Sequence, residues 1–105
     1  MRISGGEKYM QKYVVLGNWT DQGRKTLDTD YPKRLENSKK LVEEYKGTMS
    51  LCFTMGEYDF VGIIDIPDEE SMVKLLIKLN TIDKFTTKTL RAWSDTEFIE
   101  LVSAL

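Results

Sequence analysis

Residues 55–70, MGEYDFVGIIDIPDEE, decide the fold of this chain because they combine a turn, an apolar run and the start of a helix. Gly56 and Glu57 stand between two segments rich in residues that favour β-strands. Glycine at the first central position of a two-residue hairpin is typical of a type II′ turn, whose backbone matches the twist of the flanking strands. We therefore predict an antiparallel hairpin formed by strands at 48–55 and 58–66.

The same turn fixes which residues face each other across the hairpin, since register follows from the turn. The predicted pairs are Met55 with Tyr58, Thr54 with Asp59, Phe53 with Phe60, Cys52 with Val61, Leu51 with Gly62, Ser50 with Ile63, Met49 with Ile64 and Thr48 with Asp65. One face of the sheet then carries Met49, Leu51, Phe53, Met55, Tyr58, Phe60 and Ile64. The other face carries Thr48, Ser50, Cys52, Thr54, Asp59, Val61, Ile63 and Asp65.

The six acidic residues in this stretch raise the question of catalytic carboxylates. Asp59 and Asp65 share a face but lie six residues apart, about 20 Å at the rise of a strand, so they cannot act as a pair. Glu57 belongs to the turn, where a glutamate is normally solvated. The acids at 68–70 suit a helix N-cap and first turn, where negative charge is stabilised. Among the acids of this stretch, only Asp59 remains a candidate for chemistry, together with its neighbour Tyr58.

The rest of the chain supplies the other elements of one domain. Apolar periodicity predicts strands at 12–19 and 84–93 and a first helical turn near 21–27. It also predicts a longer helix to about residue 46, which Gly47 ends, and a helix capped by Asp68. A last helix is expected to begin with a capping box at Ser94–Glu97. The order β-α-β-β-α-β plus a C-terminal helix predicts an α+β, ferredoxin-like fold. Its sheet is four-stranded and antiparallel, with helices on one face and the threonine-rich strand 84–93 at an edge. We expect a single domain over 12–105.

Residues 1–11 show no apolar period and are expected to form an N-terminal extension. Gly5, Gly6 and Glu7 can be encoded by a purine-rich sequence of the kind that recruits prokaryotic ribosomes, at a suitable distance before Met10. One hypothesis is therefore that translation starts at Met10. The alternative, an ordinary leader that starts at Met1, stays open.

The amino-acid composition excludes several kinds of catalysis and binding. The 105 residues include no histidine, which removes the usual general base near neutral pH and the commonest metal ligand, so we expect no metal and no cofactor. The single cysteine, Cys52, is expected to be a buried and inert thiol. A net charge of −2 argues against nucleic acid, although Lys33, Arg34, Lys39 and Lys40 form a local basic patch. No apolar run is long enough to span a bilayer, so we expect a cytoplasmic protein without a membrane partner.

The second sheet face has an apolar middle formed by Cys52, Val61 and Ile63. A sheet covered by helices on one side only should have a polar outer face. Because closed two-fold association is the commonest way to cover such a surface, we predict a homo-oligomer. The expected form is a dimer that packs sheet to sheet, or a ring of such dimers.

The chain also resembles the GYD-domain family, named for the hairpin motif Gly-x-Tyr-Asp that stands here at 56–59. The resemblance covers about residues 10–104. Besides the hairpin it includes YVVLGNWTDQGRKTL, PKRLENSKKLVEEYKGT, PD after the third strand and a TLRAW…EF ending. It implies a ferredoxin-like fold of the dimeric α+β barrel kind in a small prokaryotic cytoplasmic protein. The family supplies no established substrate or catalytic residues.

Six residues are candidates for lining a ligand pocket: Tyr58, Asp59, Arg34, Trp19, Tyr31 and Arg91. Either arginine is suited to holding a carboxylate or phosphate, and the aromatic residues to walling an apolar cleft. Each also has a purely structural interpretation, in an ion pair, a hydrogen bond to the backbone or the core.

Two functions follow. The first is a small-ligand-binding or interaction module. The alternative is a cofactor-independent enzyme, monooxygenase- or decarboxylase-like, that acts on a small hydrophobic or carbonyl-bearing substrate.

Overall fold

The computed structural model describes residues 10–82 and 84–105. The prediction of an N-terminal extension over 1–11 therefore falls almost entirely outside the described residues. At its end, Met10 precedes the first strand, which begins at Gln11, one residue earlier than predicted.

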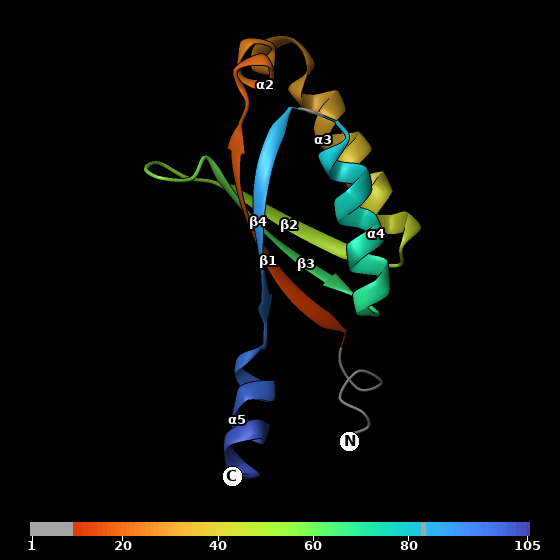
Figure 1. Ribbon diagram of the computed structural model, residues 1–105, viewed down its shortest axis with the longest axis vertical. Helices are drawn as coiled ribbons and strands as arrows, with labels where there is room; N and C mark the ends of the chain where they lie inside the picture. Colours follow the sequence, from red (N-terminus) through yellow and green to blue (C-terminus); the bar gives the residue numbers. More distant parts are fainter. Residues whose placement is uncertain (1–9, 83) are drawn as a thin grey trace.

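The described residues form an open antiparallel sheet in the order β2-β3-β1-β4 (Figure 1). Its strands are β1 (Gln11–Trp19), β2 (Thr48–Phe53), β3 (Phe60–Ile66) and β4 (Phe85–Ala92). β4 lies at an edge, as its threonine content predicts. The helices are α2 (Asp21–Lys25), α3 (Leu27–Glu44), α4 (Glu69–Asn80) and α5 (Asp95–Ser103). This is the predicted ferredoxin-like α+β fold.

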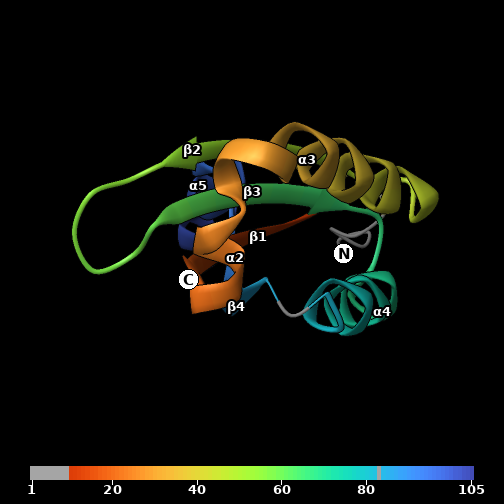
Figure 2. The same cartoon turned by 90° about the horizontal axis from the view of Figure 1, so that it is seen from above.

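The helices α3 and α4 cover the same face of the sheet (Figure 2). The core between them is apolar and consists of Tyr13, Val15, Val42, Ile64, Ile66, Met72, Leu75 and Leu79. The capping residues act as predicted, since the side chain of Asp68 accepts a hydrogen bond from the backbone of Ser71 and Ser94 forms a capping box with Glu97.

The predicted register of the hairpin is confirmed from Thr48 opposite Asp65 to Phe53 opposite Phe60. The strands end earlier than predicted, however, at residues 53 and 60 rather than 55 and 58. Asp59 explains the difference, because its backbone N–H donates to the carbonyl of Gly17, 2.8 Å away. The chain before β3 therefore bonds to the end of β1 as well as to β2. Gly56 lies at the tip of this loop with a φ of 110°.

Gly47 has a different role from the predicted one. The left-handed residue after α3 is Lys46, with a φ of 64°, and not the glycine. A Cβ on Gly47 would lie 2.8 Å from the carbonyl oxygen of Asp65. The glycine is therefore needed for the close approach of the chain to β3.

The outer face of the sheet, opposite α3 and α4, is apolar in its middle. Its apolar side chains are Val14, Leu16, Cys52, Val61, Ile63 and Leu90. Ile63 is 38% exposed, and Cys52 is exposed instead of buried as predicted, because no helix of the described residues packs over this face. The exposed apolar middle that the register predicted is present.

The last helix, α5, extends away from the end of β4 (Figure 1). Its apolar stripe faces solvent within the described chain: Phe98 is 59% exposed, and Ile99, Leu101 and Val102 are similarly open. No residue of α5 is buried. The helix thus adds nothing to the core of its own domain.

Candidate functional site

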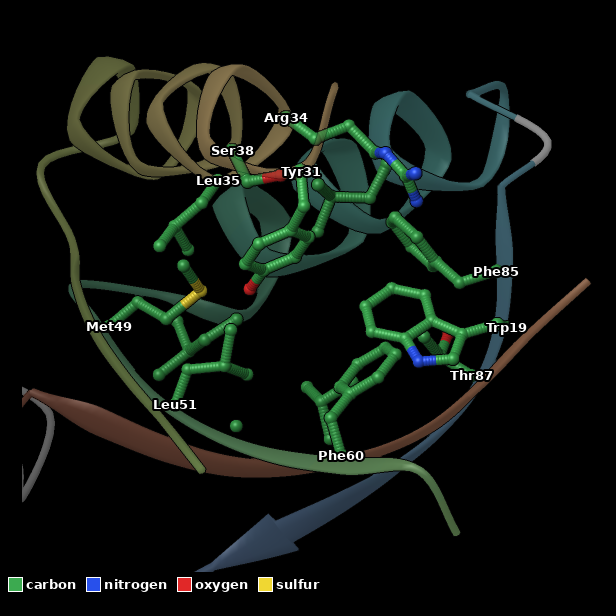
Figure 3. Close-up of a pocket in the computed structure, with 14 residues that line it drawn as sticks. Trp19, Tyr31, Arg34, Leu35, Ser38, Met49, Leu51, Phe60, Phe85 and Thr87 are labelled. Atoms are coloured by element: carbon green, nitrogen blue, oxygen red, sulfur yellow. The ribbon is translucent and has the colours of Figure 1, made fainter. Parts of the chain in front are cut away.

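A cavity of about 60 Å³ lies between the inner face of the sheet and α3 (Figure 3). Its walls come from all four strands and from α3 and α4, and they consist of Val15, Trp19, Tyr31, Arg34, Leu35, Ser38, Met49, Leu51, Phe60, Gly62, Ile64, Leu79, Phe85 and Thr87. The volume exceeds the 10–15 Å³ or so that one water needs, and it is far below the several hundred Å³ of a pocket for a drug-sized ligand. The cavity therefore suits a very small ligand.

An aromatic group stands beside the cavity. The ring centroid of Trp19 lies 5.8 Å from that of Tyr31 and 6.2 Å from that of Phe53, and the Tyr31 and Phe53 centroids are 5.5 Å apart. Together with Leu27, these three rings line a more open groove of about 260 Å³. Because Trp19 and Tyr31 line both spaces, the groove adjoins the cavity.

Strand geometry explains why the ring of Phe60 can lie on the floor of the cavity. Phe60 faces Gly17 across the β1–β3 pair. A Cβ on Gly17 would come within 2.0 Å of the Phe60 ring, so only a glycine leaves room for it.

Arg34 sits on α3 with its side chain 11% exposed, and it is held by a network of hydrogen bonds. Its Nε and Nη2 both donate to Oδ1 of Asp30, at 3.0 and 2.6 Å. Nη2 also donates to the carbonyl of Gly23 and to Oγ1 of Thr26. The hydrogen bond from Arg34 lowers the pKa of the Asp30 carboxyl, so this acid remains ionised and balances the guanidinium charge.

Two polar atoms of the cavity residues are buried without a hydrogen-bond partner among the described residues: the Tyr31 hydroxyl and Nη1 of Arg34. Figure 3 shows the hydroxyl of Tyr31 directed toward Met49 and Leu51, whereas the guanidinium of Arg34 lies on the side of Phe85. Burial raises the pKa of Tyr31, so this side chain is a neutral hydrogen-bond donor at ordinary pH.

Tyr58 and Asp59 do not line this cavity. The Oδ2 atom of Asp59 accepts a hydrogen bond from the backbone N–H of Trp19 at 2.9 Å, and its own N–H lies 3.1 Å from Oδ1 of Asn18. The carbonyl of Tyr58 accepts from Oγ1 of Thr54 at 2.6 Å. The bonds of Asp59 connect the hairpin to the end of β1, so they orient Trp19 at the edge of the cavity from outside it, whereas the bond between Thr54 and Tyr58 closes the hairpin itself.

Arg91 is likewise separate from the cavity. Its guanidinium carbon lies 4.6 Å from the centre of the Trp93 ring and 5.5 Å from that of Tyr13. It also donates to the carbonyls of Lys12 and Ala92. Arg91 therefore stacks between aromatic rings near the point where β4 leads into α5.

Of the six predicted pocket residues, the structure thus brings together Trp19, Tyr31 and Arg34. Sequence reasoning missed Met49, Leu51, Phe53 and Phe60 as neighbours of these three. The hairpin register had placed all four on one face, which was the available signal. The position of α3 over that face depends on tertiary packing, and the local pattern does not contain it.

Among residues 10–82 and 84–105, no group of three or more acidic or cysteine side chains is placed to hold a metal ion. Within the same residues, no helix is long and apolar enough to cross a membrane.

The fold and the cavity define a small α+β protein of ferredoxin-like architecture. The model of the GYD domain matches residues 13–102, so the chain belongs to the GYD domain family. The chain is also similar to a protein of Thermus thermophilus called "Glutamine synthetase and cystathionine beta-lyase binding protein". The two are 27% identical over 85 residues, which cover 79% of this chain and 88% of that protein. No solved structure was found to match.

Proposed function

We propose that this chain is a homo-oligomeric, cytoplasmic interaction module that binds another protein through α5. The observation that carries the proposal is the projecting helix with its exposed apolar stripe. Exposed stripes of this kind mark interaction surfaces when they are contiguous.

The physical argument rests on the length of α5. A helix of nine residues is marginal in water, since isolated helices need roughly 12–15 residues or more to be stable alone. The capping box at Ser94 stabilises its first turn, but no core residue of the described chain supports its apolar side. A partner surface that receives Phe98 and Leu101 supplies this missing support, in the manner of a helix that binds in a groove.

The Thermus thermophilus relative supports the class of partner. Its name describes binding to two enzymes, glutamine synthetase and cystathionine beta-lyase. We propose by extension that the partner of this chain is an enzyme of the same kind.

Self-association is the second part of the proposal and uses a different surface. The outer face of the sheet presents Val61, Ile63 and Leu90 in its middle, with an ion pair between Lys12 and Asp65 at 2.8 Å toward one end. An apolar centre with a charged margin is the usual anatomy of an interface. We propose that a second copy covers this face, sheet to sheet, in a dimer or a ring of dimers.

The binding test uses purified glutamine synthetase and cystathionine beta-lyase from the organism that encodes the chain. Each enzyme is immobilised, and binding of the full chain is measured by surface plasmon resonance. The double variant Phe98→Ser/Leu101→Ser is expected to weaken binding at least tenfold, because the substitutions remove the apolar anchors of α5. The matched control Val73→Ser/Ile77→Ser changes two exposed apolar residues of α4 and is expected to bind like the unmodified chain.

Two results would contradict the proposal. One is that neither enzyme binds the unmodified chain. The other is that the α5 variant and the α4 control bind equally well.

A further inference from the structure

The cavity between α3 and the sheet combines an apolar lining with the Tyr31 hydroxyl, which is buried and has no partner among the described residues. Burying a hydroxyl without a hydrogen bond costs about 1–3 kcal/mol. Phenylalanine would fill the same space without that cost. The hydroxyl therefore indicates a hydrogen-bonding partner that enters the cavity.

The charge of the site restricts what this partner is. Arg34 is the cationic residue of the cavity lining, and Asp30 binds it through two hydrogen bonds to Oδ1. Nη1 of Arg34 is also buried without a partner among the described residues, but the guanidinium lies on the side of Phe85 and not beside the Tyr31 hydroxyl (Figure 3). Because Asp30 already balances the guanidinium charge, a carboxylate at the hydroxyl would place an unbalanced negative charge in a mostly apolar space. Such burial is strongly unfavourable, whereas an uncharged oxygen acceptor needs only a donor.

We propose that the cavity binds a small, uncharged, largely apolar molecule with a carbonyl oxygen, which accepts a hydrogen bond from the Tyr31 hydroxyl. Trp19 and Phe53 line the approach from the open groove, and the ligand's apolar part packs between Leu51 and Phe60. This ligand site goes beyond the proposed interaction function and does not depend on it.

The size of the cavity limits the ligand to a few non-hydrogen atoms. Movement of flexible side chains decides whether the ligand reaches the Tyr31 hydroxyl. Met49 and Leu51 lie next to the Tyr31 hydroxyl in Figure 3. Methionine changes rotamer readily and adapts its shape to irregular spaces. Binding is therefore expected to displace the Met49 side chain, which makes its methyl group a direct reporter.

The experiment compares 2-butanone with propanoate, which match in size and differ in charge. The full chain is labelled with ¹³C at its methionine methyl groups, and each compound is titrated while methyl spectra are recorded. We expect 2-butanone to shift the Met49 signal saturably, with a dissociation constant on the order of 1–10 mM for so small a ligand. Propanoate is expected to cause at least tenfold weaker binding. The methyl of Met72, which is buried in the core and does not line the cavity, serves as the internal reference.

Two variants test the roles of the hydroxyl and of the charge separately. Tyr31→Phe is expected to weaken 2-butanone binding at least fivefold without lowering the melting temperature, because it removes a buried hydroxyl that has no partner among the described residues. Asp30→Asn leaves the charge of Arg34 unbalanced, so it is expected to strengthen propanoate binding at least fivefold.

Any of three outcomes overturns the proposal. The first is the absence of a saturable Met49 shift with 2-butanone, as expected if the cavity holds water only. The second is propanoate binding as tight as that of the ketone in the unmodified chain. The third is unchanged ketone binding by Tyr31→Phe.

Discussion

Asp59 joins the hairpin to the first strand from two directions at once. Its carboxylate accepts the backbone N–H of Trp19, and its own N–H donates to the carbonyl of Gly17. Thr54 adds a bond from its N–H to the carbonyl of Asp59 at 2.9 Å. The aspartate of the Gly-x-Tyr-Asp motif is thus a structural link in this chain, and it fixes the end of β1 where Trp19 borders the cavity.

Removal of this carboxylate should destabilise the fold. Asp59→Ala leaves the N–H of Trp19 without its partner, so the free energy of unfolding is expected to fall by about 1–3 kcal/mol. Urea denaturation followed by tryptophan fluorescence measures the change. Asp59→Asn keeps an acceptor oxygen and is expected to lose less than half as much. Equal stability of Asp59→Ala and the unmodified chain would show that the link is not needed.

The pair formed by Asp30 and Arg34 gives the stability of the domain a dependence on pH. The hydrogen bond from Arg34 lowers the pKa of Asp30 in the folded state. A carboxyl with a depressed folded-state pKa contributes stability above its unfolded-state pKa of about 3.9, and this contribution disappears as the pH falls through the folded-state value.

Asp30→Asn should therefore flatten the acid side of the stability profile. We expect the difference in melting temperature between the unmodified chain and this variant to shrink as the pH falls from about 6 to below about 3.9. Differential scanning fluorimetry across that range measures it. The control is Asp21→Asn, whose partner Arg24 is exposed, since such surface pairs contribute little. A constant difference between the Asp30→Asn variant and the unmodified chain at all pH values would contradict the assignment.

At the scale of elements, the sequence predicts the strands and helices well, because their signals are local. The glycine turn predicts the pairing of β2 with β3 residue by residue, and proline with Asp68 predicts the start of α4. The hairpin ends were predicted less well because Asp59 bonds to β1, a segment some forty residues earlier in the chain. Distance in sequence also hid the β2 neighbours of Tyr31, which lie some twenty residues further along the chain, since α3 and β2 meet only after folding.

For the candidate site too, residue type alone carried the prediction, whereas the arrangement of the residues depends on tertiary packing. Trp19, Tyr31 and Arg34 were predicted from residue type, which indicates what a side chain is able to bind. Arg91 has the same chemistry as Arg34 but lies against Trp93, on a part of the sheet that the cavity does not reach. Residue type alone does not separate the two arginines, because only the packing of α3 on the sheet decides which one meets a cavity.

At the scale of the whole molecule, the proposed self-association uses the outer sheet face. Ile63→Lys places a charge in the middle of the apolar patch and is expected to convert an oligomer into monomers, because burying an unpaired charge is unfavourable. Size-exclusion chromatography with light scattering at micromolar concentration measures the mass. Ile77→Lys on α4 is the matched control, since this residue is 61% exposed on the helical side, and it should leave the mass unchanged. A monomeric unmodified chain would refute self-association through this face.

The position of α5 has a consequence for how this protein can diversify. Because none of its side chains is buried against its own domain, substitutions along its apolar stripe are released from the packing constraints that act on α3 and α4. Under the proposed binding through α5, a descendant of this chain can therefore acquire a new binding specificity by changing one short helix while the sheet and its cavity are inherited intact. On this proposal, selection for partner choice and selection for foldability act on different parts of the same small domain.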